Sequence, residues 1–154
     1  MLTIVTTTTP PTGSLHLVVG YDGSPPAIRA LDAAVNLLQE RTGRIDVVYV
    51  AHLSSLAMLS PGAIAELESD FDEIEQQLRA AAAEQLRDRV AAWGFERRQG
   101  IVPEELIAIA TAIGAAGSTV AIVVGSSSHA THRVVGSVAV SLARHSPVPL
   151  VIVP

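Results

Sequence analysis

The residues best suited to chemistry lie near the carboxyl end of the chain. An apolar run over 120–124 leads into Gly125-Ser126-Ser127-Ser128, and a second small pair, Gly136-Ser137, opens another apolar segment. Small residues let backbone N–H groups approach an anion, and the N-terminus of a helix adds unpaired donors and a favourable dipole. This pattern is typical of a phosphate-binding loop.

Three polar side chains, His129, His132 and Arg133, stand in the loop between these two groups of small residues. Two interpretations are open: they donate to a bound phosphate, or they are solvated loop residues. A zinc site needs three or four converging ligands, and two histidines supply only half of such a set. We therefore predict no metal site here.

A second turn of small residues follows the first apolar run, over 15–19, and contains Gly20, Tyr21 and Asp22. Asp22 is a candidate acceptor for a ribose hydroxyl or an adenine edge. The alternative is an Asp that accepts from backbone N–H groups near a helix start. Ser24 is a candidate N-cap, and Pro25 suits the first helical position.

Several features argue against a dedicated catalytic site. The chain has no Cys and no Lys, which excludes a thiol nucleophile and the lysine of a Walker loop. No Gly-x-Ser-x-Gly elbow surrounds Ser127, because both of its neighbours are serines. We nominate no catalytic residue and expect any ATP hydrolysis to be slow.

Composition narrows the choice of partners. The net charge is −5, and the ten basic residues, all Arg, are dispersed, so the sequence argues against a nucleic-acid partner. The apolar stretch 106–116 falls short of the roughly 20 residues of a membrane span, so no membrane association is expected. The lack of Cys fits a cytoplasmic protein. Residues 1–13 are predicted to be a disordered tail, and residues 14–154 a single domain.

Apolar periodicity predicts an α/β fold. Five strands are expected at 15–19, 45–50, 95–101, 119–124 and 148–153. Four helices are expected between them, from Pro25 to a stop near Gly43, over 64–93 before Gly94, over 103–113 and over 137–144. The third strand is interrupted by charges, which suits a sheet edge. Such alternation predicts an open, doubly wound parallel sheet.

The order and spacing of these motifs resemble the universal stress protein family over nearly the whole chain. The resemblance rests on Val-Gly-Tyr-Asp-Gly-Ser at 19–24, the strand 45–50, the helix start 100–107, Val-Val-Gly-Ser at 123–126, Gly-Ser-Val at 136–138 and His-Ser-Pro-Val-Pro-Leu-Val at 145–151.

The resemblance implies the strand order 3-2-1-4-5 and a ligand at the switch point of the sheet. The implied ligand is an adenine nucleotide, ATP, AMP or cyclic AMP, with or without Mg²⁺, held as a regulatory ligand in a stress response. It also implies a homodimer that pairs through Val148 to Val153. The implied site residues are Gly20, Tyr21, Asp22, Val50, Val124, Gly125, Ser126, Ser128, Gly136, Ser137 and Val138.

The phosphate loop departs from the ATP-binding pattern of the family at two points. Ser128 stands where the family pattern has a second Gly. Seven residues, 129–135, separate it from Gly136, where the pattern has nine. A Ser at positive φ costs on the order of 1 kcal/mol, so we expect a weaker hold on the outer phosphates of ATP than on AMP or cyclic AMP. The main alternative is a dimeric interaction module of this fold without nucleotide; a nucleotide-hydrolysing relative is a weaker third.

Overall fold

Five strands form one parallel sheet in the order β3-β2-β1-β4-β5, as predicted. The computed structural model describes residues 14–39, 41–51, 61–126 and 136–154. The strands are β1 Leu15–Gly20, β2 Gly43–Ala51, β3 Trp93–Gln99, β4 Thr119–Gly125 and β5 Leu150–Val153. The chain therefore changes its direction of winding between β1 and β4, which leaves a crevice at their carboxyl ends.

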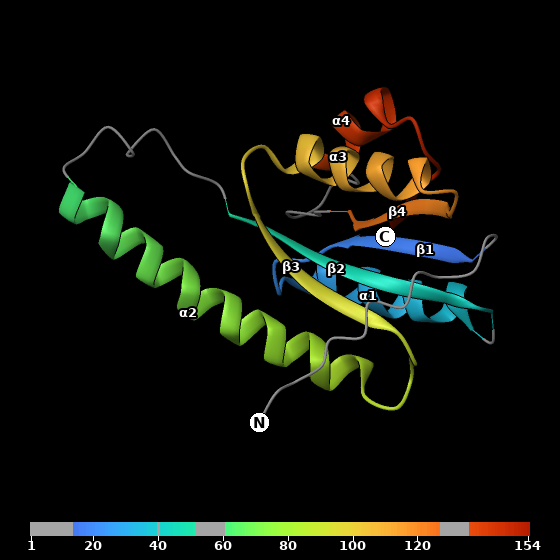
Figure 1. Ribbon diagram of the computed structural model, residues 1–154, viewed down its shortest axis with the longest axis horizontal. Coiled ribbons are helices and arrows are strands. Elements are labelled where there is room, and N and C mark those ends of the chain that lie inside the picture. The colour runs from blue at the N-terminus through green and yellow to red at the C-terminus, as the bar shows by residue number, and fades with distance from the viewer. Residues whose placement is uncertain (1–13, 40, 52–60, 127–135) are drawn as a thin grey trace.

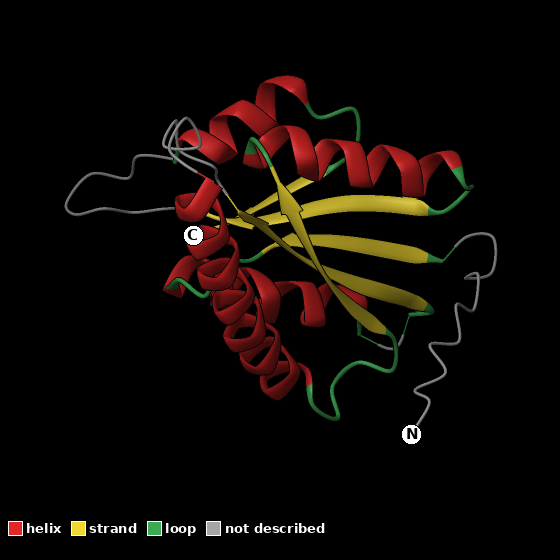
Figure 2. Cartoon of the chain, turned by 60° about the vertical axis from the view of Figure 1, so that its left-hand side comes forward, coloured by secondary structure: helices red, strands yellow, loops and turns green. Residues whose placement is uncertain are grey.

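Four helices cover the two faces of this sheet (Figures 1 and 2). They are α1 Pro25–Leu38, α2 Pro61–Leu86, α3 Val102–Ala115 and α4 Ser137–His145. Alternate residues of β1 enter opposite cores. Leu17 packs with α1 and α2 in what we call the α1-side core, and Val18 packs with α3 and α4 on the other face of the sheet. Strands buried on both faces explain the unbroken apolar runs of β1 and β4.

The helix α1 begins as predicted and ends earlier. The Ser24 hydroxyl accepts a hydrogen bond from the Ala27 N–H at 3.4 Å, and Pro25 is the first helical residue. The helix ends at Leu38, with Gln39 at a φ of 42°. Gly43 does not stop the helix but begins β2, where it passes so close to the Leu15 carbonyl that a Cβ would overlap it. The close approach of two strands therefore accounts for this glycine.

The helix α2 is shorter than predicted, because its last two apolar residues belong to other elements. It ends at Leu86, and the following turn holds Asp88 at a φ of 58°. Val90 and Trp93 still pack on the α1-side core, but from the turn and from β3. Their helical spacing was misleading because residues of different elements share one core.

The outer strands also differ from the prediction in their bounds. β3 forms one edge of the sheet, as expected, but starts at Trp93. β5 starts at Leu150, because Val148 lies in a turn where its N–H donates to the Ser146 hydroxyl at 3.3 Å. That hydroxyl in turn donates to the Val148 carbonyl at 2.8 Å.

Among the helices that the structure describes, none combines the length and apolar character that crossing a membrane would require. The segments 1–13 and 127–135, with the expected tail and the loop side chains Ser128, His129, His132 and Arg133, lie outside the described residues.

Candidate functional site

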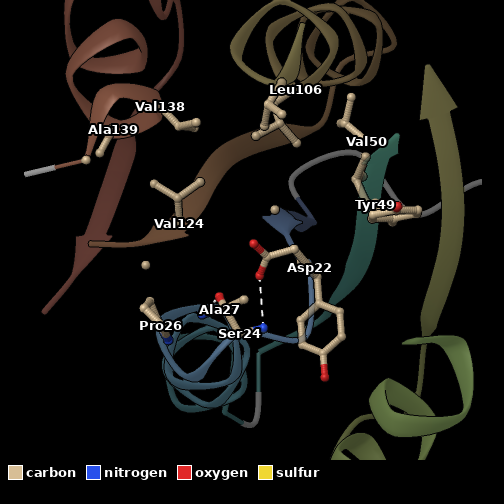
Figure 3. Close-up of a pocket in the computed structure, with 16 residues that line it drawn as sticks. Asp22, Ser24, Pro26, Ala27, Tyr49, Val50, Leu106, Val124, Val138 and Ala139 are labelled. Carbon is tan, nitrogen blue, oxygen red and sulfur yellow. Dashed lines mark hydrogen bonds between the residues drawn. The ribbon is translucent and has the colours of Figure 1, made fainter. Parts of the chain in front are cut away.

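A cavity of about 220 Å³ opens at the carboxyl ends of β1, β2 and β4. Its walls also include the first residues of α1, α3 and α4 (Figure 3). It lies where the change in winding direction creates a crevice, which is the usual ligand position in open α/β sheets. The lining residues are Gly20, Tyr21, Asp22, Ser24, Pro26, Ala27, Val48, Tyr49, Val50, Val102, Leu106, Val124, Gly125, Gly136, Val138 and Ala139.

Asp22 is the charged residue of this lining, and it stands on the turn between β1 and α1. Its Oδ1 accepts a hydrogen bond from the Ser24 N–H at 3.0 Å. The alternative role predicted for Asp22, bonding to backbone near a helix start, is therefore confirmed. That role leaves room for ligand binding, because a carboxylate has two oxygens with about four acceptor positions.

The remaining walls are largely apolar. Figure 3 shows the side chains of Val50, Leu106, Val124 and Val138 around the opening, opposite Pro26 and Ala27 of α1. An apolar cavity with a few polar groups at one side suits a ligand with a flat apolar part and a hydroxylated part.

Gly125 is explained by packing. A Cβ at this position would overlap the backbone carbonyl of Pro26, and it would lie 2.6 Å from the Pro26 Cβ. The end of β4 therefore fits against the start of α1 only without a side chain. Gly20 is less confined: a Cβ there would lie 3.2 Å from Leu106 Cδ1 and 3.3 Å from Val124 Cγ1.

The backbone N–H of Ser126 is already used within the sheet. It donates to the Val153 carbonyl at 2.7 Å, which extends the pairing of β4 with β5. This N–H is therefore not free for the phosphate cradle in which we predicted Ser126. Because this N–H is directed at β5, it points within the plane of the sheet.

Three helix N-termini reach the cavity, and they differ as anion sites. In α1, Pro25 and Pro26 have no N–H, and the Ala27 N–H already donates to the Ser24 hydroxyl. The first turn of α3 carries two carboxylates, Glu104 and Glu105. Thus neither helix offers an attractive position for a phosphate.

The N-terminus of α4 has the opposite character. No side chain of the described residues caps it, and its first turn carries no acidic residue. Gly136 is the N-cap, with φ −59° and ψ 156°, and Ser137 is the first helical residue. Ser137 therefore lies inside the helix and is not its N-cap. Val138 and Ala139, whose N–H groups belong to the first turn, line the cavity. Open donors at the positive end of a helix favour an anion.

Most of the predicted site residues meet in this cavity, but not all. Gly20, Tyr21, Asp22, Val50, Val124, Gly125, Gly136 and Val138 line it, whereas Ser126 and Ser137 do not. The sequence reasoning missed Tyr49, Leu106 and Val102. The segment 100–107 was noted as a family motif, which was a usable signal that the start of α3 belongs to the site.

Two tyrosines beside the cavity are held neutral. Burial raises the pKa of Tyr21, and the carboxylates of Asp22 and Asp32 raise it further. Burial also raises the pKa of Tyr49, against the opposing effect of the Arg97 cation. Both phenols therefore keep their protons at neutral pH and can donate hydrogen bonds. Within the described part of the chain, no three His, Asp or Glu side chains converge as a metal site.

Comparison with solved structures finds the same fold in universal stress proteins. UspA from Lactobacillus plantarum superposes with a TM-score of 0.75 at 21% identity, covering 92% of this chain and 99% of that one. A universal stress protein in complex with cAMP gives 0.63 at 20% identity, covering 91% and 97%. A universal stress protein family protein from Arabidopsis thaliana with AMP bound gives 0.56 at 10% identity, covering 90% of each chain.

No curated protein matches the chain. The sequence itself matches the universal stress protein family over residues 14–154, which is nearly the whole length. This match agrees with the strand order and with the position of the cavity at the switch point of the sheet. The chain belongs to the universal stress protein family.

Proposed function

We propose that the protein binds an adenine nucleotide in this cavity and holds it as a regulatory ligand in a stress response. One observation carries the proposal: the Asp22 carboxylate and the start of α4, which no side chain of the described residues caps, line the same cavity. The first is an acceptor for ribose hydroxyls, and the second attracts phosphate. Two relatives of the same fold are described with cAMP and with AMP.

The polarity of the cavity supports one orientation of the nucleotide. We place the base against the apolar side chains of Val50 and Leu106 and the ribose beside Asp22. The phosphates then extend toward Gly136 and the first turn of α4, away from the Asp22 carboxylate. The nucleotide, with or without Mg²⁺, is proposed as a bound signal, and any hydrolysis of ATP as slow.

We further propose that the protein acts in the cytoplasm as a homodimer that pairs through the edge strand β5, with no nucleic-acid partner. In the sheet described, β5 pairs only with β4. The carbonyls of Pro149 and Val153 accept from β4, so alternation along the strand directs the backbone groups of Leu150 and Ile152 outward. Apolar edge strands of this kind favour pairing with a second copy.

The test of nucleotide binding has two parts. Protein purified without added nucleotide is denatured, and the released small molecules are identified by mass spectrometry. ATP, ADP, AMP and cyclic AMP are then titrated calorimetrically into the wild type, Asp22→Asn and Asp88→Asn. Asp88 is an exposed turn residue at positive φ, which Asn tolerates, so it controls for the loss of one carboxylate.

We expect Asp22→Asn to weaken nucleotide binding about tenfold or more, since hydrogen bonds to charged groups contribute about 1.5–3 kcal/mol. Asp88→Asn should bind as the wild type does. Equal affinity of all three proteins for the nucleotides would show that the ribose does not lie beside Asp22 and would reject the proposed orientation. No binding of any nucleotide by the wild type would favour the alternative, a dimeric interaction module.

A further inference from the structure

The helix α2 contacts the wall of the cavity at the turn that carries Asp22. Gly23, with a φ of +76°, follows Asp22, and a Cβ built on it would lie 2.7 Å from Leu78 Cδ2. The Leu78 side chain therefore packs directly on the Gly23 backbone. Because the next N–H, that of Ser24, donates to Asp22 Oδ1, Leu78 supports the segment that orients the carboxylate.

A second contact joins α2 to another part of the cavity wall through β3. Tyr49 lines the cavity, and Arg97 is its direct partner across the β2–β3 pair. The Arg97 guanidinium donates to Asp72 Oδ1 at 2.6 Å and lies 3.4 Å from Glu75 Oε2, both on α2. Register partners on neighbouring strands present their side chains on the same face of the sheet, so Arg97 lies beside Tyr49. The influence of the Arg97 cation on the pKa of Tyr49 agrees with this proximity.

The two halves of α2 are attached to the domain in different ways. In the carboxyl half, Ala82 and Leu86 are buried in the α1-side core, and the Gln85 amide donates to the Ile28 carbonyl at 2.8 Å. The segment 68–77 is mostly exposed, and it includes Ile74, which is 39% exposed. Figure 1 shows this end of α2 extending beyond the sheet. Within the described residues, two acidic side chains of the segment 68–77 form ion pairs with Arg97, and Glu75 also pairs with Arg79 of the same helix.

We propose that α2 reports whether the cavity is filled, with Leu78 and Arg97 as the positioning residues that connect the two. The inference rests on the proposed nucleotide function and assigns its regulatory output to residues 68–77. A ligand that fixes the Asp22 turn and Tyr49 also fixes Leu78 and Arg97, and so restrains this half of the helix. By thermodynamic reciprocity, loosening α2 weakens ligand binding.

Hydrogen exchange measured by mass spectrometry tests the first part, with AMP and then ATP as the added ligands. We expect peptides covering 68–77 to exchange about fivefold more slowly in saturating nucleotide. In Arg97→Gln, this ligand-dependent protection should disappear, and the affinity for AMP should fall about fivefold. Arg97→Lys should restore part of both effects, because it keeps the charge that Asp72 and Glu75 attract.

The adjacent arginine provides a matched control. Arg98 pairs with Glu96 of its own strand at 2.8 Å and makes no ion pair with the described part of α2. Arg98→Gln should therefore keep both the affinity and the protection of 68–77. If Arg97→Gln raises exchange equally with and without AMP and leaves the affinity unchanged, Arg97 is only structural, and the proposal is wrong.

A second pair of variants tests the Leu78 contact independently. Leu78→Ala removes the contact with Gly23, whereas Ile74→Ala shortens an exposed side chain one turn earlier on the same helix. We expect weaker AMP binding only in Leu78→Ala, with circular dichroism confirming that both variants fold. A wild type that binds no adenine nucleotide overturns the proposed function together with this inference. A wild type that binds AMP with unchanged exchange at 68–77 overturns this inference alone.

Discussion

His16 Nδ1 lies 3.6 Å from Asp46 Oδ2, inside the sheet and away from the cavity. This distance exceeds that of a hydrogen bond. The other oxygen, Oδ1, already accepts from Arg44 Nε at 2.6 Å. Both ring nitrogens of His16 are buried without a hydrogen-bond partner in the described structure. Burial lowers the pKa of His16, the Asp46 carboxylate opposes this effect, and Arg44 adds to it. The buried imidazole is therefore neutral at pH 7.

This arrangement predicts that acid destabilises the protein. The folded-state pKa of His16 lies below the unfolded value of 6.5, so the unfolded chain binds the proton more readily. The stability that neutral His16 contributes is therefore complete above pH 6.5, and it is lost as the pH falls from 6.5 toward the lowered pKa of the folded state. The loss is limited to about 1.4 kcal/mol per pH unit, the equivalent of one proton.

Urea unfolding at pH 7.5, 6.5 and 5.5 measures this effect. In His16→Leu, the loss of stability between pH 7.5 and 5.5 should largely disappear. His145, exposed on α4 with Nδ1 2.8 Å from the Ser141 carbonyl, supplies the control variant His145→Gln. If His16→Leu and the wild type lost stability in parallel, another group would have to account for the acid sensitivity.

Gly136→Asp should abolish nucleotide binding and preserve the fold. The φ of −59° at this N-cap is accessible to any residue, and Asp is a favoured N-cap. Its carboxylate would accept from the same N–H groups of α4 that we assign to the phosphates, and it would repel them. Gly136→Ala leaves those donors open, so calorimetry should find that it binds. Binding by both variants would place the phosphates elsewhere.

Ile152→Pro should separate the proposed dimer into monomers. Because the Ile152 N–H points away from β4, proline removes an edge donor without breaking the β4–β5 pairing. Val151→Lys is a less selective test, since Val151 also packs on the α1-side core. Light scattering of Ile152→Pro and of Ile152→Val measures the outcome. A dimer that persists in the proline variant would place the interface on another surface.

Gly125→Ala should destabilise the fold itself. The added Cβ overlaps the Pro26 backbone, and overpacking of this kind typically costs about 1–3 kcal/mol. At Gly114 in α3, by contrast, a Cβ would sit 3.4 Å from Val120 Cγ1, an ordinary contact, so Gly114→Ala should be neutral or stabilising. Unfolding in urea compares the two. Unchanged stability with lost nucleotide binding in Gly125→Ala would instead indicate a ligand role for Gly125.

Features that depend on short-range pattern could be predicted from the sequence. The Ser24 cap and the start of α1 at Pro25 follow from adjacent residues. The apolar runs indicated β1 and β4, and the charges at 96–98 indicated that β3 lies at an edge. The family motifs added the strand order and half of the residues around the cavity, including Asp22, Val50 and Gly136.

By itself, then, the sequence determined the kinds of elements, their order and the two turns of the site, because periodicity and capping act within a few residues. Only the tertiary structure decided which groups remain available. The Ser126 N–H donates to the Val153 carbonyl, and the contact with Pro26 leaves room only for a glycine at position 125. The helix α2 ends before Val90, although Val90 packs on the same core as that helix. Each outcome depends on a contact between segments distant in sequence or on burial in a shared core, and no local pattern encodes such contacts.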